Sequence, residues 1–92
     1  MVEPMDDRRF ERSLKALANG RRLSILRLLK KRKELSVTDI AEKIRLSFRS
    51  TSRHLAILSA AEIVEREQRS LQVFYRIRDS LARVVNSVLS LL

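Results

Sequence analysis

Arginine and hydroxyl side chains gather in one short stretch of the chain, residues 46–55, which reads LSFRSTSRHL. As part of a helix over residues 47–60, the stretch turns Arg49, Ser50 and Arg53 to one side. An α-helix fits the DNA major groove, where arginine pairs bidentately with the N7 and O6 atoms of guanine. Serine hydroxyls and the free N–H groups of a helix start suit phosphate oxygens, which fix the docking. The stretch therefore predicts a DNA-reading helix.

The opposite side of this helix is expected to be buried. Thr51, Leu55 and Leu58 share that face, and Phe48 lies in line with Leu55. We therefore expect Phe48 to be an apolar anchor. The residues that we predict to contact DNA from this helix, two of them on its flanks, are Ser47, Arg49, Ser50, Ser52, Arg53 and His54.

A shorter amphipathic run precedes the reading helix. Residues 37–44 read VTDIAEKI, and Ser36 with Asp39 three residues later resembles a capping box at a helix start. A two-residue turn follows, and Ser47 is a good N-cap for the next helix. The two runs predict a helix-turn-helix.

Two further helices are predicted before this pair. Apolar residues recur at helical spacing over residues 8–18 and 21–32. Asn19-Gly20 between them should stop the first helix, because both residue types tolerate positive φ. The second helix ends in a basic run, residues 30–33, which either faces phosphates or complements the helix dipole.

The sequence period changes after the reading helix. Residues 63–67 and 73–77 are rich in β-branched and aromatic side chains and bracket a polar turn, which predicts a β-hairpin. A hairpin in this position is a wing, and we place residues 68–72 near the minor groove. Arg69, at the expected tip, either enters that groove or meets a phosphate, although a wing tip is often only a polar turn. Residues 35–37 are a candidate third strand.

Together these elements predict a mainly α fold with a β-hairpin wing, a winged helix-turn-helix of about five helices and two or three short strands. We divide the chain into a flexible N-terminal end at residues 1–7, a DNA-binding domain at 8–78 and a C-terminal dimerisation helix of the same domain at 79–92.

The predicted last helix is apolar nearly all round, and from residue 81 onward Arg83 is its only charge. Such a helix would leave an exposed apolar patch on a monomer. We predict a twofold homodimer in which the helix packs on its mate and on the first helix; the alternative is that it folds back on its own core. A dimer would place two reading helices about 34 Å apart, one DNA turn. The predicted interface residues are Phe10, Leu14, Leu17, Leu81, Val84, Val85, Val88, Leu89 and Leu92.

Composition narrows the function further. The 92 residues carry 20 Lys+Arg against 11 Asp+Glu, a formal net charge of +9, which favours a polyanionic partner. No secretory signal and no membrane-spanning run is visible, so we expect a cytoplasmic protein with no membrane partner.

Chemistry at a metal or an active site is not expected. The chain has no cysteine and one histidine, so no metal and no cofactor is predicted. No nucleophile, carboxylate pair or phosphate loop indicates an enzyme. The lone histidine, His54, is expected either to form structural hydrogen bonds or to contact the DNA backbone.

Three segments resemble the ArsR family of winged-helix regulators. LKALANGRRLSIL is similar to the family's junction of helices one and two, LSFRSTSRHLAIL to its recognition helix, and VFYRI to its last strand. The resemblance covers residues 10–78 and implies a homodimeric prokaryotic transcription factor, usually a repressor, on a palindromic operator. The residues that match the family's reading helix are Ser47, Ser52, Arg53 and His54.

The chain also departs from the family pattern. Phe48 stands where glutamine is frequent, and Arg49 stands where serine is frequent and adds a possible base or phosphate contact. Glu62 replaces a glycine before the hairpin, and the wing at residues 68–72 lacks glycine and looks longer. Metal-sensing members use cysteines near the third helix or Asp and His on the last helix. Residues 35–39 contain no cysteine and the last helix no histidine, so neither mode of sensing is expected.

Two other functions fit the same composition. A protein that coats nucleic acid without sequence preference would bind through charge alone, with a steep salt dependence. An interaction module that uses the apolar last helix on a membrane surface or another protein would not depend on Arg49 and Arg53.

Overall fold

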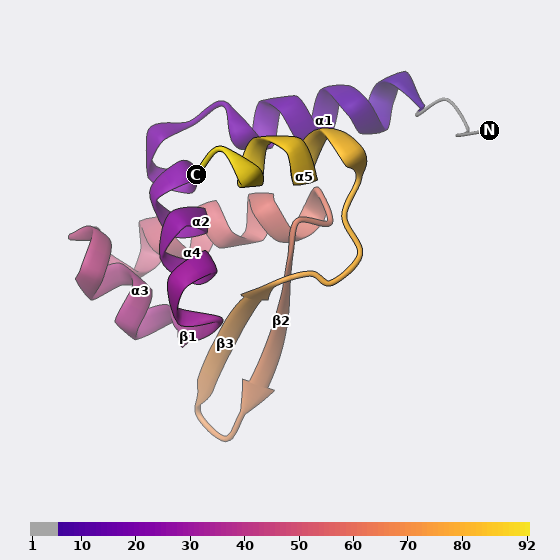
Figure 1. Ribbon diagram of the computed structural model, residues 1–92. Coiled ribbons are helices and arrows are strands. Elements are labelled where there is room, and N and C mark those ends of the chain that lie inside the picture. The colour runs from indigo at the N-terminus through magenta and orange to yellow at the C-terminus, as the bar shows by residue number, and fades with distance from the viewer. Residues whose placement is uncertain (1–5) are drawn as a thin grey trace.

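Over residues 6–92, the part of the chain that the computed structural model describes, five helices pack together and a small sheet extends from one side of them (Figure 1). The helices are α1 (Asp7–Leu17), α2 (Gly20–Arg32), α3 (Val37–Ile44), α4 (Phe48–Ala60) and α5 (Arg83–Ser90). The strands are β1 (Glu34–Ser36), β2 (Val64–Arg69) and β3 (Gln72–Ile77). The predicted fold class is confirmed, and most of the flexible end predicted for residues 1–7 lies outside the described residues.

Short polar side chains begin four of the helices by accepting hydrogen bonds from N–H groups of the first turn, which otherwise lack partners. The acceptor and donor pairs are Asp6 with Arg8 (2.8 Å), Asn19 with Arg22 (3.0 Å), Ser36 with Asp39 (3.1 Å) and Ser47 with Ser50 (3.1 Å). The predicted starts at Ser36 and Ser47 are therefore confirmed.

The junction of α1 and α2 differs from the prediction. Asn19 has an extended backbone (φ −157°) and is the N-cap of α2, of which Gly20 is the first residue. Neither residue has a positive φ. The helix stop is correct but its mechanism is wrong, because the Asn19 carboxamide satisfies α2 and does not close α1.

The three strands form an antiparallel sheet in the order β1-β3-β2. Arg69 pairs with Gln72, so the hairpin turn contains only Ser70 and Leu71. The predicted longer wing loop at residues 68–72 is wrong, since the strands continue further than the β-branched residues suggest. The hairpin projects away from the helices (Figure 1).

The last helix is shorter than predicted and lies alongside α1 (Figure 1). It begins at Arg83, because residues 79–82 carry the chain back from β3, and Ala82 offers no side-chain cap. Its carboxyl end is capped by α2, where Lys30 Nζ donates to the Leu89 carbonyl at 2.6 Å. Lys30 in the basic run thus acts as a helix cap.

One hydrophobic core joins the helices and the sheet. Its largest fully buried apolar side chains are Ile25, Leu26, Leu29, Ile40, Leu55, Leu58, Ile63, Val64 and Val85. Three predicted interface residues, Leu17, Val85 and Leu89, are at most 5 % exposed and belong to this core. For Val85 and Leu89 the alternative was correct, because α5 turns these residues toward the core of its own protomer; Leu17 of α1 lies in the same core.

Candidate DNA-binding surface

The turn between α3 and α4 sets where α4, the predicted reading helix, begins. Arg45 adopts the left-handed conformation (φ 55°, ψ 52°), and the Leu46 N–H donates to the Ala41 carbonyl at 3.0 Å. Glycine is the usual residue at such a left-handed helix end, and a residue with a side chain at this position costs about 1–2 kcal/mol of conformational energy. The turn leaves Ser47 extended, in the geometry of an N-cap.

The two sides of α4 differ as predicted. Thr51, Leu55 and Leu58 are fully buried. On the other side Arg49 and Arg53 are exposed, and neither guanidinium has a hydrogen bond or ion pair within residues 6–92. The side chains best suited to guanine edges are therefore free to reach a groove.

Phe48 is a correction to the predicted buried face, because it is 59 % exposed. The helical wheel predicted the correct buried side of α4 but not where along the helix the core ends. Ser47 and Arg49, the neighbours of Phe48, are exposed as well. The first two residues of α4 thus lie beyond the core, which begins at Thr51. Phe48 lines an open cavity of about 610 Å³ between α4 and the hairpin, together with Ser52 and Arg66.

His54 forms a contact with a buried arginine of α2. Its Nδ1 lies 3.1 Å from Arg22 Nη1. Burial lowers the pKa of His54, and the nearby charges of Arg22, Arg21 and Arg53 lower it further. Because a guanidinium only donates, the ring is neutral with Nδ1 as acceptor. The predicted structural hydrogen bond of His54 is present.

Arg22 connects three helices. Its Nε donates to the Ala16 carbonyl at 2.6 Å and its Nη2 to the Lys15 carbonyl at 3.1 Å, both in the last turn of α1. A cation at a helix carboxyl end complements the helix dipole. Arg22 therefore holds α1 against His54 of α4.

Arg21, the residue before Arg22, bonds the carboxyl end of α3 in a similar way: its Nη1 donates to the Ile44 carbonyl at 2.7 Å. The sequence interpretation missed both arginines. They follow the cap Asn19 by two and three residues and lie in the segment that resembles the family's helix junction, but neither observation distinguishes an anchor from a solvated charge.

Arg69 lies at the end of β2 and not at the tip of the turn. Its guanidinium bonds both carboxylate oxygens of Glu34 (2.7 and 2.9 Å) and one of Glu67 (2.7 Å). It also lies 4.7 Å from the centroid of the Phe74 ring. Hydrogen bonds from Arg69 lower the pKa of Glu34 and Glu67. Arg69, the predicted wing contact with DNA, is therefore already hydrogen-bonded to two carboxylates of the sheet.

Arg66 is a basic residue of the wing that the sequence interpretation did not select. It alternates along β2 with the paired residues Glu65 and Glu67, so it points to the opposite face of the hairpin. Arg66 is exposed, lines the cavity beside Phe48, and has no ion pair in the described part of the chain. Strand alternation was the available signal.

The described residues contain no group of three His, Cys, Asp or Glu side chains that could hold a metal ion. No helix within residues 6–92 combines the length and the apolarity needed to cross a membrane.

A helix-turn-helix with an unpaired basic face, followed by an antiparallel hairpin, defines a winged helix-turn-helix DNA-binding protein. The family model described as "bacterial regulatory protein, arsR family" matches residues 19–66. The arsenical resistance operon repressor of Bacillus subtilis is 32% identical over 83 residues, which cover 90% of this chain and 76% of the relative. The transcriptional activator HlyU of Vibrio cholerae is 36% identical over 76 residues, covering 83% and 69%.

A solved structure agrees with these relatives. The homodimeric winged helix-turn-helix DNA-binding domain Mb0332 of Mycobacterium bovis, described as a possible ArsR-family regulator, superposes with a TM-score of 0.78 at 31% identity. The match covers 99% of this chain and 85% of that one. The chain belongs to the arsR family of bacterial transcriptional regulators.

Proposed function

We propose that the chain represses transcription by binding a palindromic operator in double-stranded DNA as a homodimer. The observation that carries the proposal is the exposed face of α4, where Arg49 and Arg53 lack partners within residues 6–92, while Thr51, Leu55 and Leu58 on the opposite face are fully buried. In the major groove these arginines read guanines, and the Ser47 end of α4 meets a phosphate. Ser50, Ser52 and the remaining edge of His54 complete the contact.

The wing contacts the neighbouring backbone in this arrangement. Arg69 keeps its predicted role as a DNA contact only if its bonds to Glu34 and Glu67 open. Arg66 needs no such rearrangement, and it faces the same cavity as Phe48 and Ser52. We therefore assign the stronger wing contact, to a phosphate, to Arg66.

The dimer interface uses apolar side chains that the protomer leaves uncovered on α1 and α5. Phe10 and Leu14 are 41% and 43% exposed. The partly buried interface residues are Leu81, Val84, Val88 and Leu92. Since α5 lies alongside α1, these side chains form one surface, as a twofold contact requires. Phe10→Glu should convert the dimer to a monomer in sedimentation experiments; an unchanged dimer would contradict this interface.

Selection of bound sequences from a random DNA pool tests the function itself. A homodimer with two equal reading helices should enrich a palindrome with half-sites about 10 base pairs apart. Loss of enrichment in Arg49→Ala/Arg53→Ala would attribute the motif to α4. A coating protein would enrich no motif, and an interaction module would retain no DNA, so either result rejects the proposal. In a transcription assay on the selected site, adding the protein should lower transcript yield, whereas an increase would indicate an activator.

A further inference from the structure

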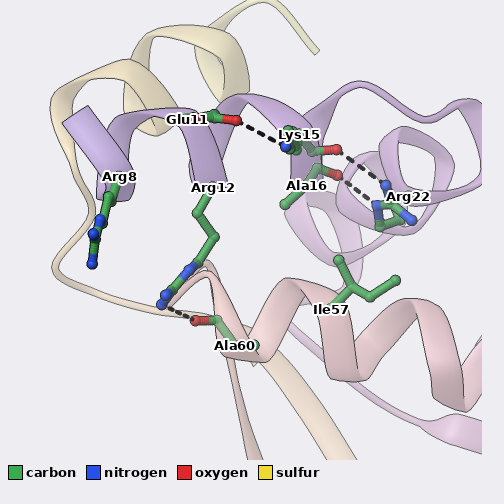
Figure 2. Close-up of a pocket in the computed structure, with 8 residues that line it drawn as sticks. All are labelled: Arg8, Glu11, Arg12, Lys15, Ala16, Arg22, Ile57 and Ala60. Atoms are coloured by element: carbon green, nitrogen blue, oxygen red, sulfur yellow. Dashed lines mark hydrogen bonds and ion pairs between the residues drawn. The ribbon is translucent and has the colours of Figure 1, made fainter.

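A groove of about 480 Å³ separates α1 from the carboxyl half of α4 (Figure 2). Arg8 and Arg12 extend from α1 toward α4, whereas Ile57 points from α4 toward α1. Ala16 and Ala60 complete an apolar floor. We propose that this groove binds a small organic anion with an apolar body, such as a substituted aromatic carboxylate.

The charges at the groove favour an anion. Glu11 and Lys15 neutralise one another in an ion pair of 2.8 Å. Among residues 6–92, Arg8 has no ion pair, and Arg12 donates only a long hydrogen bond of 3.4 Å to the Ala60 carbonyl. Two guanidiniums one helical turn apart are thus available to a single carboxylate, which arginine binds with two parallel hydrogen bonds.

The floor of the groove favours an apolar body on that anion. Ile57 is one of the few large hydrophobic side chains left exposed, at 39%. An aromatic ring against Ile57 and Ala60 would remove this surface from water. Sites for small molecules combine apolar surface with placed polar groups. Here Ala16, Ile57 and Ala60 supply the apolar surface, and the other five lining residues are charged.

The groove is separate from the proposed dimer interface. Arg12 lies two residues from both Phe10 and Leu14, and two residues correspond to about 200° around a helix. The groove and the interface therefore occupy opposite sides of α1. The same site can form in a monomer or a dimer.

A DNA duplex does not fit the groove. Ile57 lies eight residues beyond Arg49 along α4, about 12 Å by helix rise, and α1 covers this half of α4 (Figure 2). The space under α1 suits a small molecule. Binding is measured without DNA, so the outcome does not depend on the proposed operator function.

The test is an amide-resolved NMR titration of the full chain with 4-tert-butylbenzoate and, separately, with its uncharged amide. The acid should shift the amide signals of Arg12, Ile57 and Ala60, with a dissociation constant in the millimolar range or tighter. The amide, which has the same body without the charge, should bind about tenfold more weakly. Equal affinity of acid and amide, or shifts confined to α5, would overturn the proposal without any variant.

A double variant tests whether Arg8 and Arg12 are the residues that bind the carboxylate. Arg8→Gln/Arg12→Gln should weaken binding of the acid about tenfold. The matched control is Arg27→Gln/Lys31→Gln, which removes two exposed basic residues at the same spacing from α2 and should change the constant less than about twofold. If both double variants bind equally, the groove does not select the anion.

Discussion

The predicted reading helix α4 and the β2–β3 hairpin both carry exposed arginines, but those of α4 are all unpaired, whereas on the hairpin Arg66 alone lacks a partner within residues 6–92. Arg49 and Arg53 have no acidic partner within residues 6–92. On the hairpin, Arg69 bonds two carboxylates and Arg76 three. Both regions contribute to the net charge of +9. Charge alone therefore does not identify the residues that meet DNA; the arginines without partners are the available ones.

A third arrangement, the buried Arg22, sets the position of α4 and should give the largest effect. Arg22→Ala removes two hydrogen bonds to α1 carbonyls and the contact with His54. Because bonds from a charged donor are stronger than neutral ones, we expect a loss of about 3 kcal/mol in unfolding free energy. Urea denaturation measures it. The control Arg21→Ala, which removes one exposed bond to Ile44, should cost about 1 kcal/mol; an equal loss in both variants would contradict the anchoring role.

Removing an unpaired arginine from α4 tests the comparison directly. Arg53→Ala should weaken binding to the selected operator by about 1–3 kcal/mol without changing stability. Its matched control is Arg27→Ala, an exposed arginine of α2 that should leave affinity within about 0.5 kcal/mol. Fluorescence anisotropy at fixed salt measures both. If Arg53→Ala binds as the parent does, α4 is not the reading helix.

On the hairpin, the paired and the unpaired arginine should respond differently. Arg66→Ala should weaken operator binding by about 1 kcal/mol and reduce the salt slope by about 1, as expected for one lost phosphate contact. Arg69→Ala should leave that slope unchanged, because its guanidinium already bonds Glu34 and Glu67. A reduced slope in Arg69→Ala and not in Arg66→Ala would reverse the assignment.

Local patterns predicted much of the fold, and long-range partners account for what they missed. Ser47 could be identified as a cap and Thr51 as buried, because caps and helix faces depend on a few adjacent residues. The anchoring role of Arg22 depends on His54, 32 positions away, and the pairing of Arg69 on Glu34, 35 positions away. No local spacing encodes either contact.

Backbone exceptions show a second limit. Glu62 was noted as a replacement for a glycine, and the structure gives it a φ of 60°. Its carboxylate pairs with Arg9 at 3.3 Å. The only glycine of the chain, Gly20, does not have a positive φ. Glycine is the residue type expected at a positive φ, but here Gly20 does not adopt one and Glu62 does. Residue type alone therefore predicted a left-handed backbone at the wrong position.

The buried side of α4 offers a smaller test. The Thr51 hydroxyl is fully buried and finds no hydrogen-bond partner among residues 6–92. Replacing it by a methyl group in Thr51→Val should raise the unfolding free energy by about 1 kcal/mol. Thr51→Ser keeps the hydroxyl and removes a buried methyl, so it should lower that free energy by about 1 kcal/mol. Thermal denaturation ranks the three proteins, and a Val variant below the parent would show that the hydroxyl is satisfied.

The smallest effect is a pH dependence at the contact that joins Arg22 to α4. The pKa of His54 is lowered in the folded protein by burial and then by the neighbouring arginines. Its ordinary value is about 6.5. Above that pH the ring is neutral in both the folded and the unfolded chain, so His54 does not make the unfolding free energy depend on pH. Below it the unfolded chain takes up a proton first, and stability falls as the pH falls from about 6.5 toward the folded pKa. Glu34 and Glu67, whose pKa values are lowered, lose stabilisation only at more acidic pH.

Because the chain has one histidine, His54→Gln should remove the decrease in the urea midpoint between pH 7.5 and 5.5. The glutamine oxygen can still accept from Arg22, so the variant isolates titration from the loss of the bond. If His54→Gln loses stability over this interval as the parent does, another group titrates there. In that case the protonated group is not at the contact between Arg22 and α4.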